Sequence, residues 1–206
     1  MTIRNERSTQ DDVPVAGIDI ELLVLDLTTC SRCQGTLANI ERAIETIRPV
    51  LETTGSHVVL RKIVIESEAQ ARQYRFVTSP TVRVNGRDLT LETLESRCED
   101  CTDLCGCDEG TSCRVWRHRG REYTEAPVGL VIEALLREIV GGGRTGAAVR
   151  EYDGVPDNLR RFFERTSARE PGRSCCSSEE QETCCEPTEK AACCATTTQS
   201  GTCGCR

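Results

Sequence analysis

The Cys30-x-x-Cys33 pair lies between a strand-like run and an amphipathic helix pattern, and this placement constrains both the fold and the chemistry. The run covers 18–27, and the helix pattern spaces its apolar residues by three and four: Leu37, Ile40, Ile44, Ile47 and Leu51. Free N–H groups and the positive end of the helix dipole lower the pKa of a cysteine at such a junction. The sequence therefore predicts thiolate chemistry here, either disulfide exchange or ligation of a soft metal.

Composition narrows the class of protein. The chain has 206 residues, a net charge of −7 and a pI near 5.1, which argue against nucleic acid and anionic membranes as partners. The N-terminus has no signal-peptide core, and no apolar run approaches the ~18 residues of a membrane span. We therefore expect a cytoplasmic protein. In that reducing compartment, fifteen cysteines point to catalytic or metal-bound thiols rather than a static disulfide framework.

The apolar pattern divides the chain into zones. We expect a disordered lead-in (1–15), a folded α/β domain (16–143) with a cysteine-rich insertion (98–113), a linker with a short helix (144–168) and a disordered cysteine-rich tail (169–206). Within the domain, the expected strands are 18–27, a buried 57–65, 78–84 and a hairpin over 115–118 and 121–123. The expected helices run from the dithiol to about 53, with a kink at Pro49, and over 68–74 and 127–140.

This order of elements resembles the thioredoxin-like fold, a mixed central sheet flanked by helices. In that superfamily a cis-proline before the third core strand lies beside the dithiol, and Ser79-Pro80-Thr81 occupies that place in the order. The resemblance implies that Cys30 is the attacking thiolate and Cys33 the resolving thiol. It also implies that the residue ahead of Pro80 offers its backbone to an extended substrate.

More specifically, the chain resembles an uncharacterised prokaryotic family of thioredoxin-like domains of unknown function. The resemblance is carried by Leu25-Asp-Leu-Thr-Thr-Cys-Ser-Arg-Cys33, Ser79-Pro-Thr-Val-Arg-Val-Asn-Gly86 and Cys113-Arg-Val-Trp-Arg-His-Arg-Gly-Arg-Glu-Tyr123. It covers about residues 18–140 and not the tail. Since the activity of the family is unsettled, it supports the fold more than the function.

The dithiol allows other interpretations. Its two thiols would otherwise ligate a metal permanently, as half a zinc site, or pack inertly. Arg32 would add positive charge that favours a thiolate. Asp26 is either a proton relay near the dithiol or a solvated acid at the end of the strand.

A second group of cysteines interrupts the fold, and its members are Cys98, Cys101, Cys105, Cys107 and Cys113. Few apolar residues surround them, so hydrophobic burial alone would not order this loop. A metal held by four thiolates would supply the missing order, with zinc as the default, independently of the Cys30–Cys33 pair. The alternatives are regulatory disulfides, metal-sensing thiols or free thiols.

The tail repeats adjacent cysteines every nine residues. Its cysteines are Cys175, Cys176, Cys184, Cys185, Cys193, Cys194, Cys203 and Cys205. The pairs resemble those of metallothioneins, and adjacent thiols suit soft ions such as Cu(I), Hg(II) or As(III). The alternative is a low-complexity tail in which a neutral Cys-Cys unit has multiplied.

Two functions follow from these patterns. One is thiol–disulfide exchange, with or without soft-metal handling, through Cys30, Cys33 and Pro80. Its partners would be a protein or small-molecule disulfide or a metal-transfer partner, together with an external reductant. The other is a non-enzymatic soft-metal binding or resistance protein with the Cys-Cys repeats as chelators. We expect no nucleotide cofactor, since the sequence contains no phosphate loop or dinucleotide fingerprint.

Overall fold

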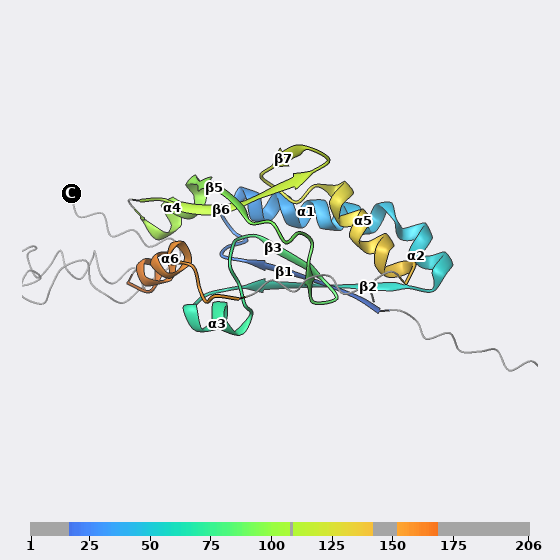
Figure 1. Cartoon of the computed structure of the whole chain (residues 1–206), viewed down its shortest axis with the longest axis horizontal. Coiled ribbons are helices and arrows are strands. Elements are labelled where there is room, and N and C mark those ends of the chain that lie inside the picture. The colour runs from blue at the N-terminus through green and yellow to red at the C-terminus, as the bar shows by residue number, and fades with distance from the viewer. Residues whose placement is uncertain (1–16, 108, 142–151, 169–206) are drawn as a thin grey trace, which may run out of the picture. The chain divides into compact units, whose positions relative to one another are not determined.

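A four-stranded mixed sheet forms the centre of the fold (Figure 1). The structure is a computed structural model, and it describes residues 17–107, 109–141 and 152–168. The strand order is β2-β1-β3-β4, in which β1 and β2 are parallel and β3 runs antiparallel to both of its neighbours. The strands are β1 (Gly17–Val24), β2 (His57–Val64), β3 (Thr81–Val84) and β4 (Arg87–Asp88).

Helices cover both faces of this sheet. Figure 1 shows α1 (Ser31–Thr46), α2 (Arg48–Thr54) and α5 (Val128–Ile139) on one side and α3 (Glu68–Gln73) on the other. The alternating side chains of β1 that lie in the core are 1% exposed or less: Ile18, Ile20, Leu22 and Val24. The structure has two helices where the sequence predicted one with a kink at Pro49: α1 ends at Thr46, and the proline lies in the first turn of α2. None of the helices in the described ranges is long and apolar enough to cross a bilayer.

The prediction of a buried strand over 57–65 is wrong in its burial. Among the described strands, β2 pairs with β1 alone, so it forms an edge of the sheet. Val59 and Val64 are 48% and 40% exposed. A run of β-branched residues fits an edge strand as well as a central one, so composition could not distinguish the two.

The predicted turns are confirmed. Asn85 and Gly86 have φ angles of 49° and 76° and connect β3 to β4 as a two-residue hairpin. Arg119 and Gly120 do the same between β6 (Thr111–His118) and β7 (Arg121–Tyr123). The Ser79–Pro80 peptide bond is cis, as the resemblance implied.

The cysteine-rich insertion is more regular than expected. In place of a loop it contains α4 (Glu99–Cys105). The strand that leads into it, β5 (Leu94–Cys98), pairs with β6 in a second, antiparallel sheet of order β5-β6-β7. The buried side chains of α4 are Cys101, Thr102 and Cys105. Small sulfur and hydroxyl side chains therefore fill the space that larger apolar residues would otherwise occupy.

Strand β6 joins the insertion to the central sheet. The backbone N–H of Arg114 donates to the carbonyl oxygen of Ser79 at 2.7 Å, and its guanidinium binds both carboxylate oxygens of Asp88 at 2.9 and 3.0 Å. The guanidinium also lies over the Trp116 ring, 4.6 Å from its centroid. These contacts fix β6 beside the cis-proline turn.

The predicted helix near the end of the described chain is present as α6 (Asp157–Ala168). Its apolar residues Leu159, Phe162 and Phe163 are buried. The side chain of Asn158 pairs with both backbone groups of Ser112 in β6. Predictions for 1–15 and for the tail from 169 onward lie outside the described residues.

Candidate thiolate metal centre

Four cysteines from separate parts of the sequence bring their sulfur atoms together. The sulfurs of Cys30, Cys98 and Cys101 all lie within 4.8 Å of one another. The Cys101 sulfur is 3.7 Å from that of Cys30 and 3.5 Å from that of Cys113. All four side chains are 1% exposed or less. We refer to Cys30, Cys98, Cys101 and Cys113 as the sulfur cluster.

The spacing of the sulfur cluster fits a tetrahedral metal ion. Zinc binds thiolates at about 2.3 Å, so two sulfurs of a tetrahedral site lie about 3.8 Å apart. The two short sulfur–sulfur distances in the cluster, 3.7 and 3.5 Å, are close to that edge. A donor set made only of thiolates selects zinc or another soft ion over calcium or magnesium. These buried thiols could therefore hold a metal ion.

Two Cys-x-x-Cys motifs occupy equivalent places, one at the start of α1 and one at the start of α4. Cys30 precedes the first residue of α1 and Cys98 precedes the first residue of α4, so each starts a helix. Cys33 and Cys101 follow within the first turn of the respective helices. Neither starting cysteine forms a side-chain hydrogen bond to the backbone of its helix. The same local geometry thus presents a sulfur from the central domain and two sulfurs from the insertion.

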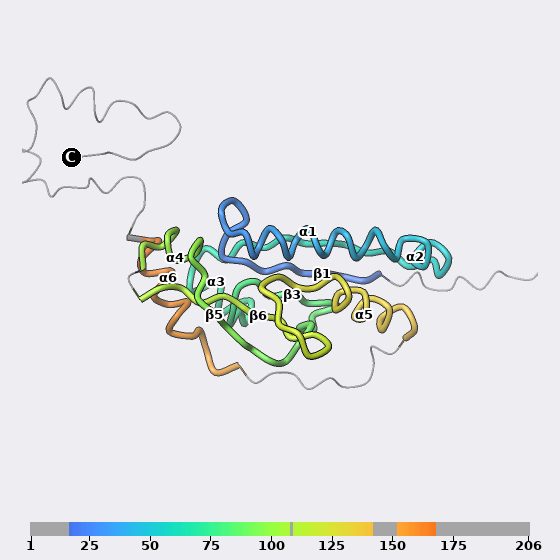
Figure 2. The backbone as a smooth tube through the Cα atoms, turned by 90° about the horizontal axis from the view of Figure 1, so that it is seen from above, coloured from blue at the N-terminus to red at the C-terminus, as the bar shows by residue number. Residues whose placement is uncertain are grey.

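Polar contacts hold the insertion against the first turn of α1. The Asp100 carboxylate accepts hydrogen bonds from the backbone N–H and the hydroxyl of Ser31 at 2.7 and 2.6 Å. The guanidinium of Arg32 donates to the carbonyl and hydroxyl oxygens of Ser96 and to the carbonyl oxygen of Arg97. Both views place α4 beside the start of α1 (Figures 1 and 2). Arg32, which the sequence suggested as a charge favouring a thiolate, therefore anchors β5.

Asp26 organises the loop that leads to Cys30. Its carboxylate accepts hydrogen bonds from the backbone and hydroxyl groups of Thr28 and Thr29 and from the backbone N–H of Cys30. Partial burial acts to raise the pKa of Asp26, but these hydrogen bonds prevail and lower it to about 2. A carboxylate that stays ionised and fully engaged positions the loop, which differs from both the proton relay and the solvated acid considered from the sequence.

The neighbouring thiols perturb one another strongly. Hydrogen bonds from Cys101 and then Cys113, Cys33 and Cys98 lower the pKa of Cys30. Hydrogen bonds from Cys101 and Cys113 lower the pKa of Cys98 to about 7. The hydrogen bond to Cys30, together with burial, raises the pKa of Cys33. One thiolate is thus stabilised by several thiol donors, and a cation would be needed for all four cluster sulfurs to ionise together.

Cys33 and Pro80 lie on the central-sheet side of the sulfur cluster. The Cys33 sulfur is 3.5 Å from the hydroxyl oxygen of Ser79 and contacts the backbone N–H of Asp26. Pro80 directly precedes β3, and the carbonyl oxygen of Ser79 accepts a hydrogen bond from the N–H of Arg114. The backbone group expected to receive an extended substrate is therefore bonded to the chain's own β6.

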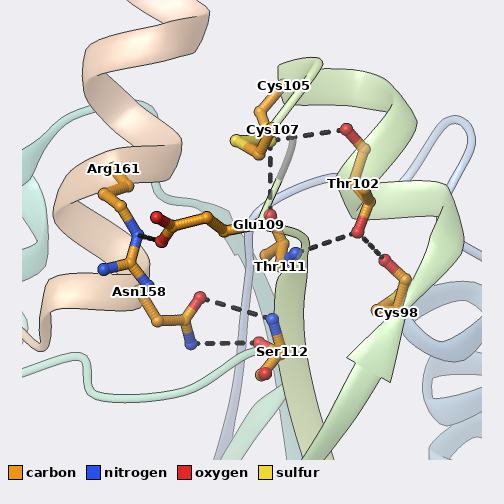
Figure 3. The surroundings of a disulfide bond; sticks show 9 residues. All are labelled: Cys98, Thr102, Cys105, Cys107, Glu109, Thr111, Ser112, Asn158 and Arg161. Atoms are coloured by element: carbon orange, nitrogen blue, oxygen red, sulfur yellow. Dashed lines mark hydrogen bonds and ion pairs between the residues drawn. A yellow bond between two sulfur atoms is a disulfide. The ribbon is translucent and has the colours of Figure 1, made fainter.

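Cys105 and Cys107 are joined as a disulfide at the end of α4, so they are not ligands in this structure. Figure 3 shows how the surrounding hydroxyl groups connect this disulfide to Cys98, the last residue of β5. The Cys105 sulfur contacts Thr111, Thr111 donates its N–H to Thr102, and the Thr102 hydroxyl donates to the carbonyl oxygen of Cys98. These contacts support Cys98 at the junction between β5 and α4.

Sequence reasoning treated the loop cysteines and the Cys30–Cys33 pair as independent, and the structure differs on this point. It draws Cys98, Cys101 and Cys113 to Cys30 and separates them from Cys105 and Cys107. The repeated Cys-x-x-Cys spacing was a signal that the two groups have equivalent local geometry, but it carried no information on docking. The eight predicted tail ligands lie outside the described residues.

Comparison with known proteins identifies the family of the chain, and the description of that family assigns it no function. No curated protein and no solved structure matches the chain. Residues 17–135 match a family described as a domain of unknown function, DUF2703, and this segment contains the whole sulfur cluster and Cys33. Because the match spans more than half of the sequence, the chain belongs to the DUF2703 family.

Proposed function

We propose that the chain is a thioredoxin-like protein that binds a soft metal ion through a buried centre formed by the sulfur cluster. The observation that carries the proposal is the convergence of Cys30, Cys98 and Cys101 within 4.8 Å, with Cys113 3.5 Å from Cys101. The sheet order β2-β1-β3-β4 and the cis-proline beside the dithiol support the thioredoxin-like fold. In this proposal Cys30, the first cysteine of the Cys30-x-x-Cys33 motif, is a metal ligand.

Zinc is the ion that the donor set favours. Four thiolates in a tetrahedral arrangement form a closed site, which is the arrangement of structural zinc rather than of catalytic zinc with an open position. The three-sulfur group of Cys30, Cys98 and Cys101 also suits As(III) or Hg(II), and Cu(I) shares the preference for thiolates. The proposed activity is therefore metal binding, with a thiol-bearing metal donor or acceptor as partner.

Thiol–disulfide exchange is the second candidate function. The Cys30-x-x-Cys33 motif and the cis peptide bond before Pro80 favour it. Two observations oppose it. The side chains of Cys30 and Cys33 are both buried, and the carbonyl oxygen of Ser79 already accepts a hydrogen bond from the N–H of Arg114. Exchange with a protein substrate would require the insertion to move away, so metal binding agrees better with the observed contacts.

The test is native mass spectrometry of the full-length protein, purified under reducing conditions and then incubated with zinc and a competing chelator. The Cys101→Ser variant removes a cluster sulfur, and a matched control, Cys105→Ser with Cys107→Ser, removes two buried cysteines of the same insertion. We expect one chelator-resistant zinc ion in the wild type and the control and none in Cys101→Ser. Retention of that ion by Cys101→Ser would exclude the proposed centre.

A further inference from the structure

We propose that Cys33 is the resolving thiol of a peroxide reaction that releases the metal from the sulfur cluster. This inference rests on the proposed function, since it concerns the same centre. The described residues contain five free buried cysteines, whereas a tetrahedral site uses four. Cys33 is the fifth, because its sulfur interacts with Cys30, Ser79 and Asp26, whereas the Cys113 sulfur interacts with Cys101, Cys30 and Cys98.

The surroundings of Cys33 place it with Cys30 and away from the other cluster residues. Its sulfur contacts the Ser79 hydroxyl oxygen, the Asp26 N–H and Cys30, which all belong to the central domain. The other three cluster sulfurs come from 98–113. Cys30 and Cys33 share the first turn of α1, closed by the bond from Gln34 N–H to the Cys30 carbonyl oxygen at 3.0 Å. A bond between these two sulfurs therefore does not require the insertion to move.

Burial decides which oxidant can act. Cys33 and the four residues of the sulfur cluster are 1% exposed or less, so a bulky disulfide cannot reach them without opening the site. Hydrogen peroxide is only slightly larger than water. It is also the class of oxidant that converts a thiolate to a sulfenic acid, which a nearby thiol then condenses to a disulfide.

The reaction balances in two steps. The Cys30 thiolate attacks one oxygen of the peroxide, so that the O–O bond breaks, Cys30 becomes a sulfenic acid and hydroxide leaves. The Cys33 thiol then attacks the Cys30 sulfur, an S–S bond forms, the S–O bond breaks, and the thiol proton leaves with the hydroxyl group as water. The two sulfurs together lose two electrons, which reduce the peroxide. The metal loses one of its four thiolates.

Cys33 has a chemical advantage over the three cluster sulfurs of the insertion as the partner of Cys30. While the metal is bound, Cys98, Cys101 and Cys113 each direct a lone pair to the ion, whereas Cys33 is not needed as a ligand. After the reaction three thiolates of the insertion remain for the ion. Cys30 no longer supplies a thiolate, because its sulfur is part of a neutral disulfide. Since affinity depends on deprotonated ligands, a competing chelator then removes the ion.

The sequence allows the new bond to be identified directly. Trypsin cleaves after Arg32, between the two cysteines, so a Cys30–Cys33 disulfide links the fragments Ser8–Arg32 and Cys33–Arg42. The other cluster cysteines lie together in the fragment Cys98–Arg114. Zinc-loaded full-length protein is treated with hydrogen peroxide beside a chromogenic zinc chelator, then alkylated, unfolded, digested and weighed by mass spectrometry.

We expect the linked fragments Ser8–Arg32 and Cys33–Arg42 to accumulate in step with zinc release. Release should be several-fold slower in Cys33→Ser and in Cys33→Ala, and unchanged when Cys105 and Cys107 are both serine. Linkage of Ser8–Arg32 to Cys98–Arg114, or equal release in the Cys33 variants, would overturn the role of Cys33 while leaving the centre intact. Absence of a tightly bound ion in the untreated protein would overturn both proposals.

Discussion

Arg114 is a fully buried cation whose position determines where β6 lies. Asp88 binds it through both carboxylate oxygens, and Trp116 packs against its plane. The next residue toward the N-terminus is Cys113 of the sulfur cluster. Removing one member of a buried ion pair costs more than the pair contributes, because the remaining charge loses its partner without regaining water. The position of the Cys113 sulfur thus depends on the neighbouring ion pair between Arg114 and Asp88.

We expect Asp88→Ala to lower the free energy of unfolding by about 3 kcal/mol, since it leaves the Arg114 guanidinium buried without its carboxylate. Glu92→Ala is the matched control, because Glu92 pairs with Arg117 of the same strand but both side chains are about half exposed, at 46% and 47%. Exposed pairs contribute ~0–1 kcal/mol, so the control should change little. Chemical denaturation of the reduced, zinc-saturated protein measures both. Equal losses in the two variants would contradict this account of Arg114.

At the scale of elements, α4 docks on the start of α1 through Asp100. That carboxylate accepts two hydrogen bonds from Ser31, the residue that follows Cys30. Contacts of this kind fix the orientation of a metal ligand, and their loss typically weakens metal binding. The contact also joins the two parts of the chain that supply the cluster sulfurs.

Asp100→Asn should therefore weaken zinc binding by about tenfold or more while leaving the secondary structure intact. Glu99→Gln is the control, since it removes the same charge from the same turn of α4 but at an exposed side chain. Competition with a chelator of known affinity gives both constants, and circular dichroism verifies the fold. If Glu99→Gln weakened binding as much as Asp100→Asn, the effect would be one of net charge near the centre.

What could be predicted from the sequence was mainly local. The turns at Asn85-Gly86 and Arg119-Gly120, the change of direction near Pro49 and the periodic helices each depend on residues that are close in sequence. The contact between Cys30 and Cys101 joins residues 71 positions apart, and no local pattern encodes it. Helix α4 escaped prediction because Cys101, Thr102 and Cys105 are buried without the large apolar side chains that define a helical stripe.

At the scale of the whole molecule, the fifteen cysteines fall into two sets with different expected behaviour. Seven lie between Cys30 and Cys113, of which four form the sulfur cluster, and eight lie between Cys175 and Cys205. A centre whose ligands already converge pays little ordering entropy when it binds an ion. The tail sequence offers its thiols mainly as adjacent pairs, which supply two thiolates to an ion rather than four, so we expect a lower affinity for zinc there. The first metal equivalent should therefore enter the centre.

We predict that replacing all eight tail cysteines with serine leaves the first, tightest zinc equivalent unchanged and abolishes the further uptake of Hg(II) or Cu(I). The adjacent pairs in the tail supply two thiolates each, which suffices for the two-coordinate binding that soft ions accept. Stepwise metal titration of the reduced full-length protein and of the eight-serine variant, followed by native mass spectrometry, gives the stoichiometry at each addition. Identical total uptake by the two proteins would show that the tail does not bind metal and would favour the interpretation of a neutral repeat. Loss of the first equivalent in the variant would instead mean that tail thiols complete the centre.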